Sequence, residues 1–210
     1  MTETVKTAGG MKTREAILDS ALRLFLKQGY HATGMREIAR EAGISLGAAY
    51  NHFSSKEQIL EELLRHNNMY GAMAAGLSRA HGDTVAEMLQ SGFTEIMASV
   101  EGKVHFPLLV FIDVLEFQGQ HVGKLATEAI PTVMGFFQRI YSMGTARGEM
   151  RDVSPILAMR TFVGMVFSSF VIENLAATLN IEALSRLALR QDNWQQGMVD
   201  ILLHGVLKEV

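Results

Sequence analysis

The stretch MREIAREAGISLGAAYNHF, residues 35–53, carries the strongest structural signal in this chain. Apolar side chains recur three, four and seven positions apart, the spacing of one helix face; they are Met35, Ile38, Ala39 and Ala42. Gly43 then favours the left-handed backbone that ends a helix. Ser45 is a typical cap for the start of the next helix. The stretch therefore predicts two helices joined by a tight turn.

The second of these helices suits contact with a DNA groove. Its small residues let the helix backbone approach closely, and Tyr50, Asn51 and His52 end in hydrogen-bonding groups. A helix-turn-helix motif docks its second helix in the major groove in this way. An amphipathic helix is predicted before the motif at 16–25, and overlapping capping boxes start another helix at 54–58.

The longer run AILDSALRLFLKQGYHATGMREIAREAGISLGAAYNHFSSKEQIL, residues 16–60, resembles the DNA-binding domain of the TetR family of transcriptional repressors. The C-terminal LLHGVL, residues 202–207, is similar to the usual ending of that family. There are departures: the family often has Ser or Thr in place of Gly34, and Lys in place of Leu46. The base contacts of this chain therefore need not follow the family pattern.

The resemblance implies an all-α protein with an N-terminal three-helix helix-turn-helix domain and a C-terminal helical bundle for ligand binding and dimerisation. We expect a disordered tail over 1–11, the DNA-binding domain over 12–58, and the effector-binding and dimerisation domain over 59–210. The residues expected at the DNA lie on the recognition helix and at the neighbouring helix ends. They are Thr33, Gly34, Arg36, Ser45, Leu46, Gly47, Ala48, Tyr50, Asn51, His52 and Lys56.

Composition narrows the other possibilities. The chain has 210 residues and a net charge of −3, so charge alone gives no strong sign of nucleic-acid binding. It has no cysteine, which excludes a disulfide framework or a thiolate metal site, and we expect no metal or cofactor. We see no secretory signal and no apolar run near the 18 residues of a membrane span, and expect a cytoplasmic protein without membrane contact.

Beyond residue 68 the pattern predicts only helices. The expected ranges are 55–78, 84–100, 106–118, 122–146, 155–179 and 193–208. The last two have broad apolar faces and small residues that permit close helix approach, so we expect them to form a homodimer interface, as the resemblance implies. The dimerisation residues expected are Met159, Val163, Phe167, Met198, Ile201, Leu202 and Gly205.

The middle helices are expected to enclose a ligand pocket, because 13 methionines and 11 phenylalanines suit an adaptable apolar site. The expected lining is Phe93, Met97, Leu109, Asp113, Glu116, Phe117, Phe137, Phe170 and Glu173. A carboxylate among apolar groups is costly unless it is paired or hydrated. The acids either select a cationic or hydrogen-bonding end of an apolar effector, or pair with Arg139 or Arg160, or face solvent.

These patterns predict a homodimeric repressor that binds an inverted-repeat operator in double-stranded DNA and is released by a small, largely apolar effector. We expect effector binding to move the helix at 55–78, which joins the two domains. The alternative is a DNA-binding regulator without a ligand, whose C-terminal domain only dimerises. An enzyme is disfavoured, because the chain has no cysteine nucleophile and no Glu-x-x-His pair for a di-metal site.

Overall fold

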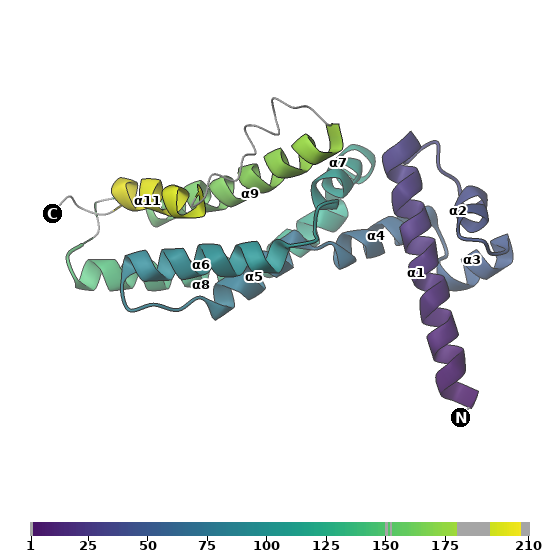
Figure 1. Cartoon of the computed structure of the whole chain (residues 1–210), viewed down its shortest axis with the longest axis horizontal. Coiled ribbons are helices and arrows are strands. Elements are labelled where there is room, and N and C mark those ends of the chain that lie inside the picture. The colour runs from purple at the N-terminus through teal and green to yellow at the C-terminus, as the bar shows by residue number, and fades with distance from the viewer. Residues whose placement is uncertain (1, 150, 152, 180–193, 207–210) are drawn as a thin grey trace. The chain divides into compact units, whose positions relative to one another are not determined.

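The computed structural model describes residues 2–149, 151, 153–179 and 194–206, and their side chains over 10–149, 151, 153–172 and 196–205 (Figure 1). Within these ranges the chain forms helices and turns and no strand, which confirms the all-α prediction. The helices are α1 Thr2–Gln28, α2 Met35–Glu41, α3 Leu46–His52, α4 Lys56–His66, α5 Met69–Arg79, α6 Val85–Val100, α7 Phe106–Phe117, α8 Gln120–Ala146, α9 Pro155–Leu179 and α11 Trp194–Val206.

Two expectations about helix extent differ from the structure. Residues 2–11, expected to be disordered, form the first turns of α1. The single helix expected over 55–78 is divided into α4 and α5 at Asn67 and Asn68. The Asn67 side chain donates to the carbonyl of Leu63 at 2.9 Å, and the Asn68 side chain accepts from the amide of Gly71 at 3.0 Å. Each asparagine thus satisfies a backbone group that a helix end leaves unpaired.

The chain divides into two compact units, and the boundary is not where we expected it. The first unit contains residues 1–67 and 106–123, and the second contains 68–105 and 124–210. The asparagine pair lies at the boundary between α4 and α5. Helix α7 and the first turn of α8 belong to the first unit, because α7 packs against α4.

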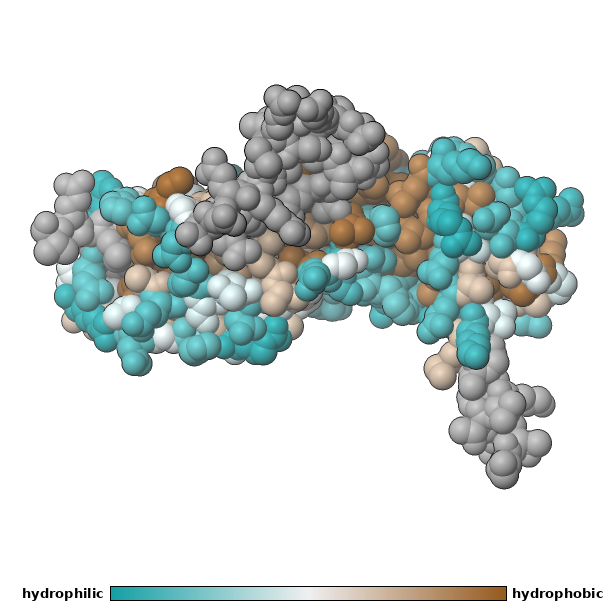
Figure 2. Space-filling model, in the orientation of Figure 1, coloured by the Kyte–Doolittle hydropathy of each residue, from teal (hydrophilic) through white to brown (hydrophobic). Residues whose placement is uncertain are grey.

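The first unit is held together by an apolar core that its helices share. Buried side chains come from α1, α2 and α4, and include Ile17, Ile38 and Leu60. Arg14 of α1 makes an ion pair with Glu62 at 3.0 Å and lies over the ring of Phe53. Helix α7 is apolar on all sides, so part of it stays exposed, and Figure 2 shows hydrophobic surface over this helix.

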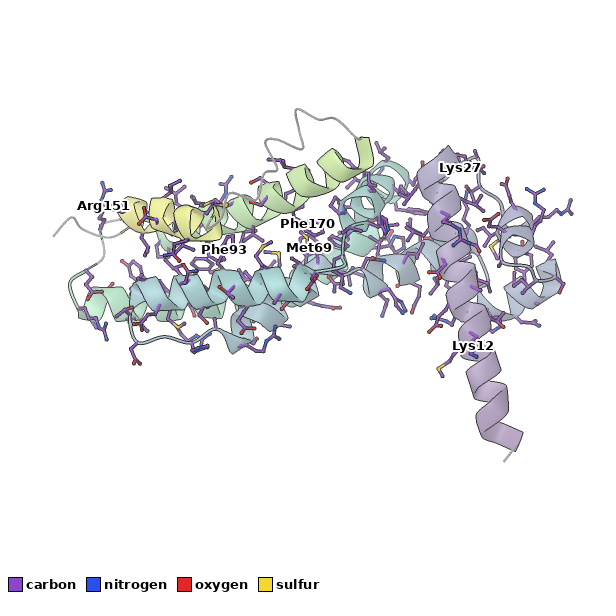
Figure 3. All side chains as sticks on the ribbon, viewed as in Figure 1. Lys12, Lys27, Met69, Phe93, Arg151 and Phe170 are labelled. Atoms are coloured by element: carbon purple, nitrogen blue, oxygen red, sulfur yellow. The ribbon has the colours of Figure 1, made fainter. Side chains whose placement is uncertain are left out.

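The second unit has an aromatic core. The rings of Phe93 from α6, Phe136 and Phe137 from α8, and Phe162 from α9 meet mostly edge to face, with centroids 5.3–6.2 Å apart. Such geometry is favourable for aromatic pairs. Phe93, Phe170 and Met69, labelled in Figure 3, are all buried.

Helix α9 is unusually apolar for a helix with so little burial. Residues 155–172 have a mean hydropathy of 1.7, yet only 17% of that stretch is buried. We had expected no apolar stretch of such length. Length and composition alone would let this helix cross a membrane, as they would for many core or interface helices of soluble proteins.

Candidate functional site

The turn between α2 and α3 depends on a glycine. Gly43 has φ +69°, a backbone conformation that side chains with a Cβ adopt only under strain. Its amide donates to the carbonyl of Arg40 at 3.2 Å, and the amide of Ile44 donates to the carbonyl of Ala39 at 3.0 Å. This pair of bonds is the Schellman motif, which ends one helix and redirects the chain. The predicted helix, turn and second helix are therefore present.

Helix α3 buries one face and presents the other to solvent. Its N-cap Ser45 accepts a hydrogen bond from the amide of Ala48 at 3.1 Å, and Ala49 is fully buried. Gly47 and Asn51 are exposed, and Tyr50 keeps 51% of its surface accessible. The solvent-facing side of this short helix thus carries hydrogen-bonding side chains and a glycine whose backbone is accessible, as a groove-binding helix requires.

The remaining residues expected at this surface divide into three groups. Arg36 and Gly34 are exposed at the start of α2, while Leu46, Ala48 and His52 are half-buried on α3. Gly34 caps α2 only through its carbonyl, which accepts from the amides of residues 37 and 38 at 3.0 Å. The third group, Thr33 and Lys56, has other partners.

Thr33 and Lys56 stabilise the first unit internally. Thr33 is buried, and its hydroxyl donates to the carbonyl of Gly29 at 2.9 Å. The ammonium of Lys56 donates to the carbonyl of Tyr30 and lies 3.9 Å from the centre of the Tyr30 ring. Partial burial lowers the pKa of Lys56. Both side chains therefore bind backbone carbonyls of the segment just after α1, and their expected contact with DNA stays a prediction.

Asp113 is a structural residue of the corner between α7 and α8. It is fully buried, and its carboxylate accepts from the amide of Val122 at 2.9 Å and lies 2.6 Å from Nδ1 of the buried His121. The Asp113 carbonyl also accepts from the amide of Gly119, whose φ of +76° turns the chain between the two helices. We had named Arg139 or Arg160 as its alternative partners, but the partner is His121.

Three further contacts fix the same corner to the segment that follows α1 and to α4, within the first unit. Glu116 lies 2.7 Å from Nε2 of His31, and the Phe117 ring meets the ring of Tyr30 edge-on at 5.6 Å. His121 lies 3.5 Å from the carboxylate of Glu57. Burial, aided by the nearby carboxylates, raises the pKa of Tyr30 to about 12. We call this set the α7 anchor; its residues are Tyr30, His31, Glu57, Asp113, Glu116, Phe117 and His121.

A cavity of about 570 Å³ lies in the second unit among α5, α8 and α9. Its lining consists of Met69, Tyr70, Met73, Ala126, Ala129, Ile130, Val133, Met134, Met159, Arg160, Val163, Gly164 and Phe167. The volume is in the range of small-molecule sites. Four of the described lining residues are methionines, and the abundance of methionine in the sequence did not indicate which of them would lie there.

The residues expected to line a pocket do not line this cavity. Asp113, Glu116 and Phe117 belong to the α7 anchor, and Leu109 is buried in the same unit. In the second unit, three of the expected residues are buried in the core and one is half-buried; they are Phe93, Phe137, Phe170 and Met97. The side chain of Glu173 lies outside the described residues.

The residues expected at the dimer interface lie in three kinds of place: the cavity lining, the packed part of α11 and the exposed surface. Met159, Val163 and Phe167 line the cavity, and Phe167 remains 38% exposed. On α11, Leu202 is buried and Met198 is half-buried with its sulfur 3.4 Å from the hydroxyl of Ser169. Ile201 and Gly205 are exposed.

Comparison with known proteins identifies the family. A family profile described as "Bacterial regulatory proteins, tetR family" matches residues 17–63. The HTH-type transcriptional repressor KstR2 of Rhodococcus jostii is 32% identical over 167 residues, which cover 73% of this chain and 76% of that protein. This chain belongs to the TetR family. The uncharacterized HTH-type transcriptional regulator YvkB of Bacillus subtilis is 31% identical, covering 76% of this chain and 82% of its own length.

Solved structures of the TetR type share the fold. The ketosteroid transcriptional regulator KstR2 of Mycobacterium tuberculosis superposes with a TM-score of 0.60 at 22% identity, covering 93% of this chain and 95% of that one. The MbdR regulator of Azoarcus sp. CIB has a TM-score of 0.65 at 22% identity, covering 92% and 98%. The protein is thus a DNA-binding transcriptional regulator of the TetR family.

The structure also explains a short motif that otherwise resembles one found in enzymes. The letters GISLG, residues 43–47, fit the GxSxG pattern of serine hydrolases, in which the serine follows a strand. Here the serine follows helix α2, and its hydroxyl caps α3. The relatives are transcriptional regulators, so the protein is not an enzyme.

Proposed function

We propose that this TetR-family regulator is a homodimeric, cytoplasmic repressor that binds an inverted-repeat operator and releases it when a small apolar effector enters the second unit. The observation that carries the proposal is the solvent-facing side of α3, where Gly47, Tyr50 and Asn51 stand free of the core. Such groups can reach base edges in the major groove, while the exposed Arg36 can contact phosphate.

Exposed apolar side chains on α9 and α11 support a dimer. Ile156, Leu157 and Ile172 keep 57%, 58% and 41% of their surface accessible, and Ile201 of α11 keeps 70%. Association with a second copy of the chain would bury such exposed apolar side chains. A homodimer also supplies the second recognition helix that an inverted repeat needs, about 34–36 Å from the first.

Helix α8 supplies a physical route from effector to DNA. Its first turn carries His121 and Val122, which bind Asp113 in the α7 anchor, and His121 also contacts Glu57 at the start of α4. Its later residues, from Ala126 to Met134, line the cavity. A ligand that displaces α8 therefore acts on the α7 anchor and through it on α4. By linkage, operator binding must weaken effector binding by the same factor.

Operator binding by recognition-helix variants tests the proposal. The parent protein first selects its operator by footprinting on genomic DNA, and Tyr50→Ala and Asn51→Ala are then titrated against that site. We expect each to lose about 1–3 kcal/mol of operator affinity if the residue contacts a base. Tyr141→Ala, an exposed tyrosine of α8, is the matched control and should bind as the parent does.

The same experiment can refute the proposal. If the parent protects no DNA site, or if both recognition-helix variants bind the operator as tightly as the Tyr141→Ala control, α3 is not the DNA-binding surface. If the operator is bound but no apolar compound releases it, the protein is a regulator without an effector, and its second unit only dimerises.

A further inference from the structure

The cavity in the second unit has a distinct charge pattern. Arg160 is the only charged residue among the described lining residues, and nearly all the others are apolar. Arg160 is exposed on α9, and none of the described side chains forms an ion pair or hydrogen bond with it. A cation at the open side of an apolar cavity is a natural counter-charge for an anionic ligand group.

Tyr70 adds a second polar group to the lining. Its side chain is half-buried, and burial raises the pKa of its hydroxyl above the usual value. A tyrosine hydroxyl is protonated at neutral pH, so it can both donate and accept a hydrogen bond. Among the described lining residues, Arg160 is thus the polar side chain that can only donate, and a carboxylate, which only accepts, is its complement.

Two carboxylates that we expected to favour a cationic ligand, those of Asp113 and Glu116, lie elsewhere. Asp113 is bound to His121 and to the amide of Val122, and Glu116 is paired with His31, all within the first unit. A cationic ligand in this cavity would face Arg160, and none of the lining residues that the structure describes is acidic. Unpaired charge in apolar surroundings is unfavourable.

We propose that the effector of this regulator is a hydrophobic molecule with one carboxylate, whose apolar part fills the cavity and whose carboxylate binds Arg160. This inference rests on the proposed function, because it names the ligand class of that site. The cavity of about 570 Å³ is large enough for an extended alkyl or fused-ring body. Methionines at 69, 73, 134 and 159 let the walls adapt to it.

A matched set of probes tests the assignment. Dodecanoate, dodecanol and dodecylamine share one chain and differ in head-group charge, and each is titrated below its aggregation concentration into the full-length protein. Dissociation constants follow from the rise in melting temperature. We expect dodecanoate to bind about fivefold more tightly than dodecanol, a ratio suited to an ion pair that stays partly exposed, with dodecylamine the weakest.

Two variants isolate the role of Arg160. Arg160→Gln is expected to abolish the preference for the acid over the alcohol and to leave dodecanol affinity unchanged. Arg139→Gln is the control, since it removes the same charge from an exposed residue of α8 that does not line the cavity. It should retain the fivefold preference. Sedimentation of both variants establishes whether either changes the oligomeric state.

Several results would overturn the assignment. They are equal binding of acid and alcohol by the parent, no binding of any probe, a preference that survives in Arg160→Gln, or dissociation of the dimer in that variant, which would place Arg160 between subunits. Failure of the proposed function gives a different result. In that case the acid still binds with its Arg160-dependent preference, but the parent binds no operator.

Discussion

Gly34 begins α2 without a side chain that could cap the helix. Its φ of −116° and ψ of 159° are ordinary extended values, and a Cβ built on it meets no atom within 4 Å. The position therefore accepts a hydroxyl side chain without strain. The glycine leaves a first-turn amide unpaired and adds freedom to the unfolded chain.

We predict that Gly34→Ser stabilises the protein by about 0.5–1 kcal/mol, because serine caps the helix and restricts the unfolded state. Gly34→Ala separates the two effects, since alanine restricts the chain but cannot cap. Chemical denaturation measures both. A Gly34→Ser variant no more stable than Gly34→Ala would show that the cap is not formed.

Helices α5 and α6 approach each other closely at Gly76 of α5. A Cβ at Gly76 would lie 2.7 Å from the carbonyl oxygen of Glu95 and 2.9 Å from the Cα of Ile96. Both are backbone atoms, so rotation of a side chain cannot relieve the overlap. The helix pair is therefore spaced for a residue without a side chain.

We predict that Gly76→Ala lowers the free energy of unfolding by about 1–3 kcal/mol, the usual range for an overpacked core. Gly135→Ala on α8 is the control, because its Cβ would meet nothing within 4 Å. There alanine is expected to stabilise the helix by about 0.5–1 kcal/mol. If thermal unfolding shows that alanine changes the stability of both variants in the same direction, the close approach of α5 and α6 is contradicted.

Sequence predicted the helices well where their ends are fixed locally. Three residues fix helix ends through hydrogen bonds to backbone groups a few positions away: Gly43, Ser45 and Thr84. A short stretch of sequence is therefore enough to predict those helix ends. The break at Asn67 and Asn68 was missed although asparagine is a good cap, because the apolar pattern continues across it. In α7 the apolar residues surround the helix, and no periodicity indicates where Asp113 points. Its partner His121 is found only once the corner is folded.

For the whole molecule, the exposed apolar side chains of α9 support the proposed homodimer. Leu157 is 58% exposed and does not line the cavity, so a substitution there tests the proposed subunit contact separately from ligand binding. We predict that Leu157→Asp dissociates the dimer, because an unpaired charge in an apolar interface costs several kcal/mol. Operator affinity is expected to fall with it.

Analytical sedimentation at micromolar concentration measures this directly. Tyr141→Asp introduces the same charge at an exposed residue of α8 and should sediment as the parent does. A parent protein that is monomeric under these conditions would refute the dimer, as would a Leu157→Asp variant that remains dimeric.

The first unit is assembled from two separated segments of chain, and this limits how the regulator can be re-engineered. A fusion that transplants only residues 1–67 onto another sensor would leave Tyr30 and Glu57 without Phe117 and His121. The graft would retain its recognition helix and lose the corner by which a sensor could act on it. A working chimera has to carry residues 106–123 as well, so its design needs three junctions, at 67/68, 105/106 and 123/124.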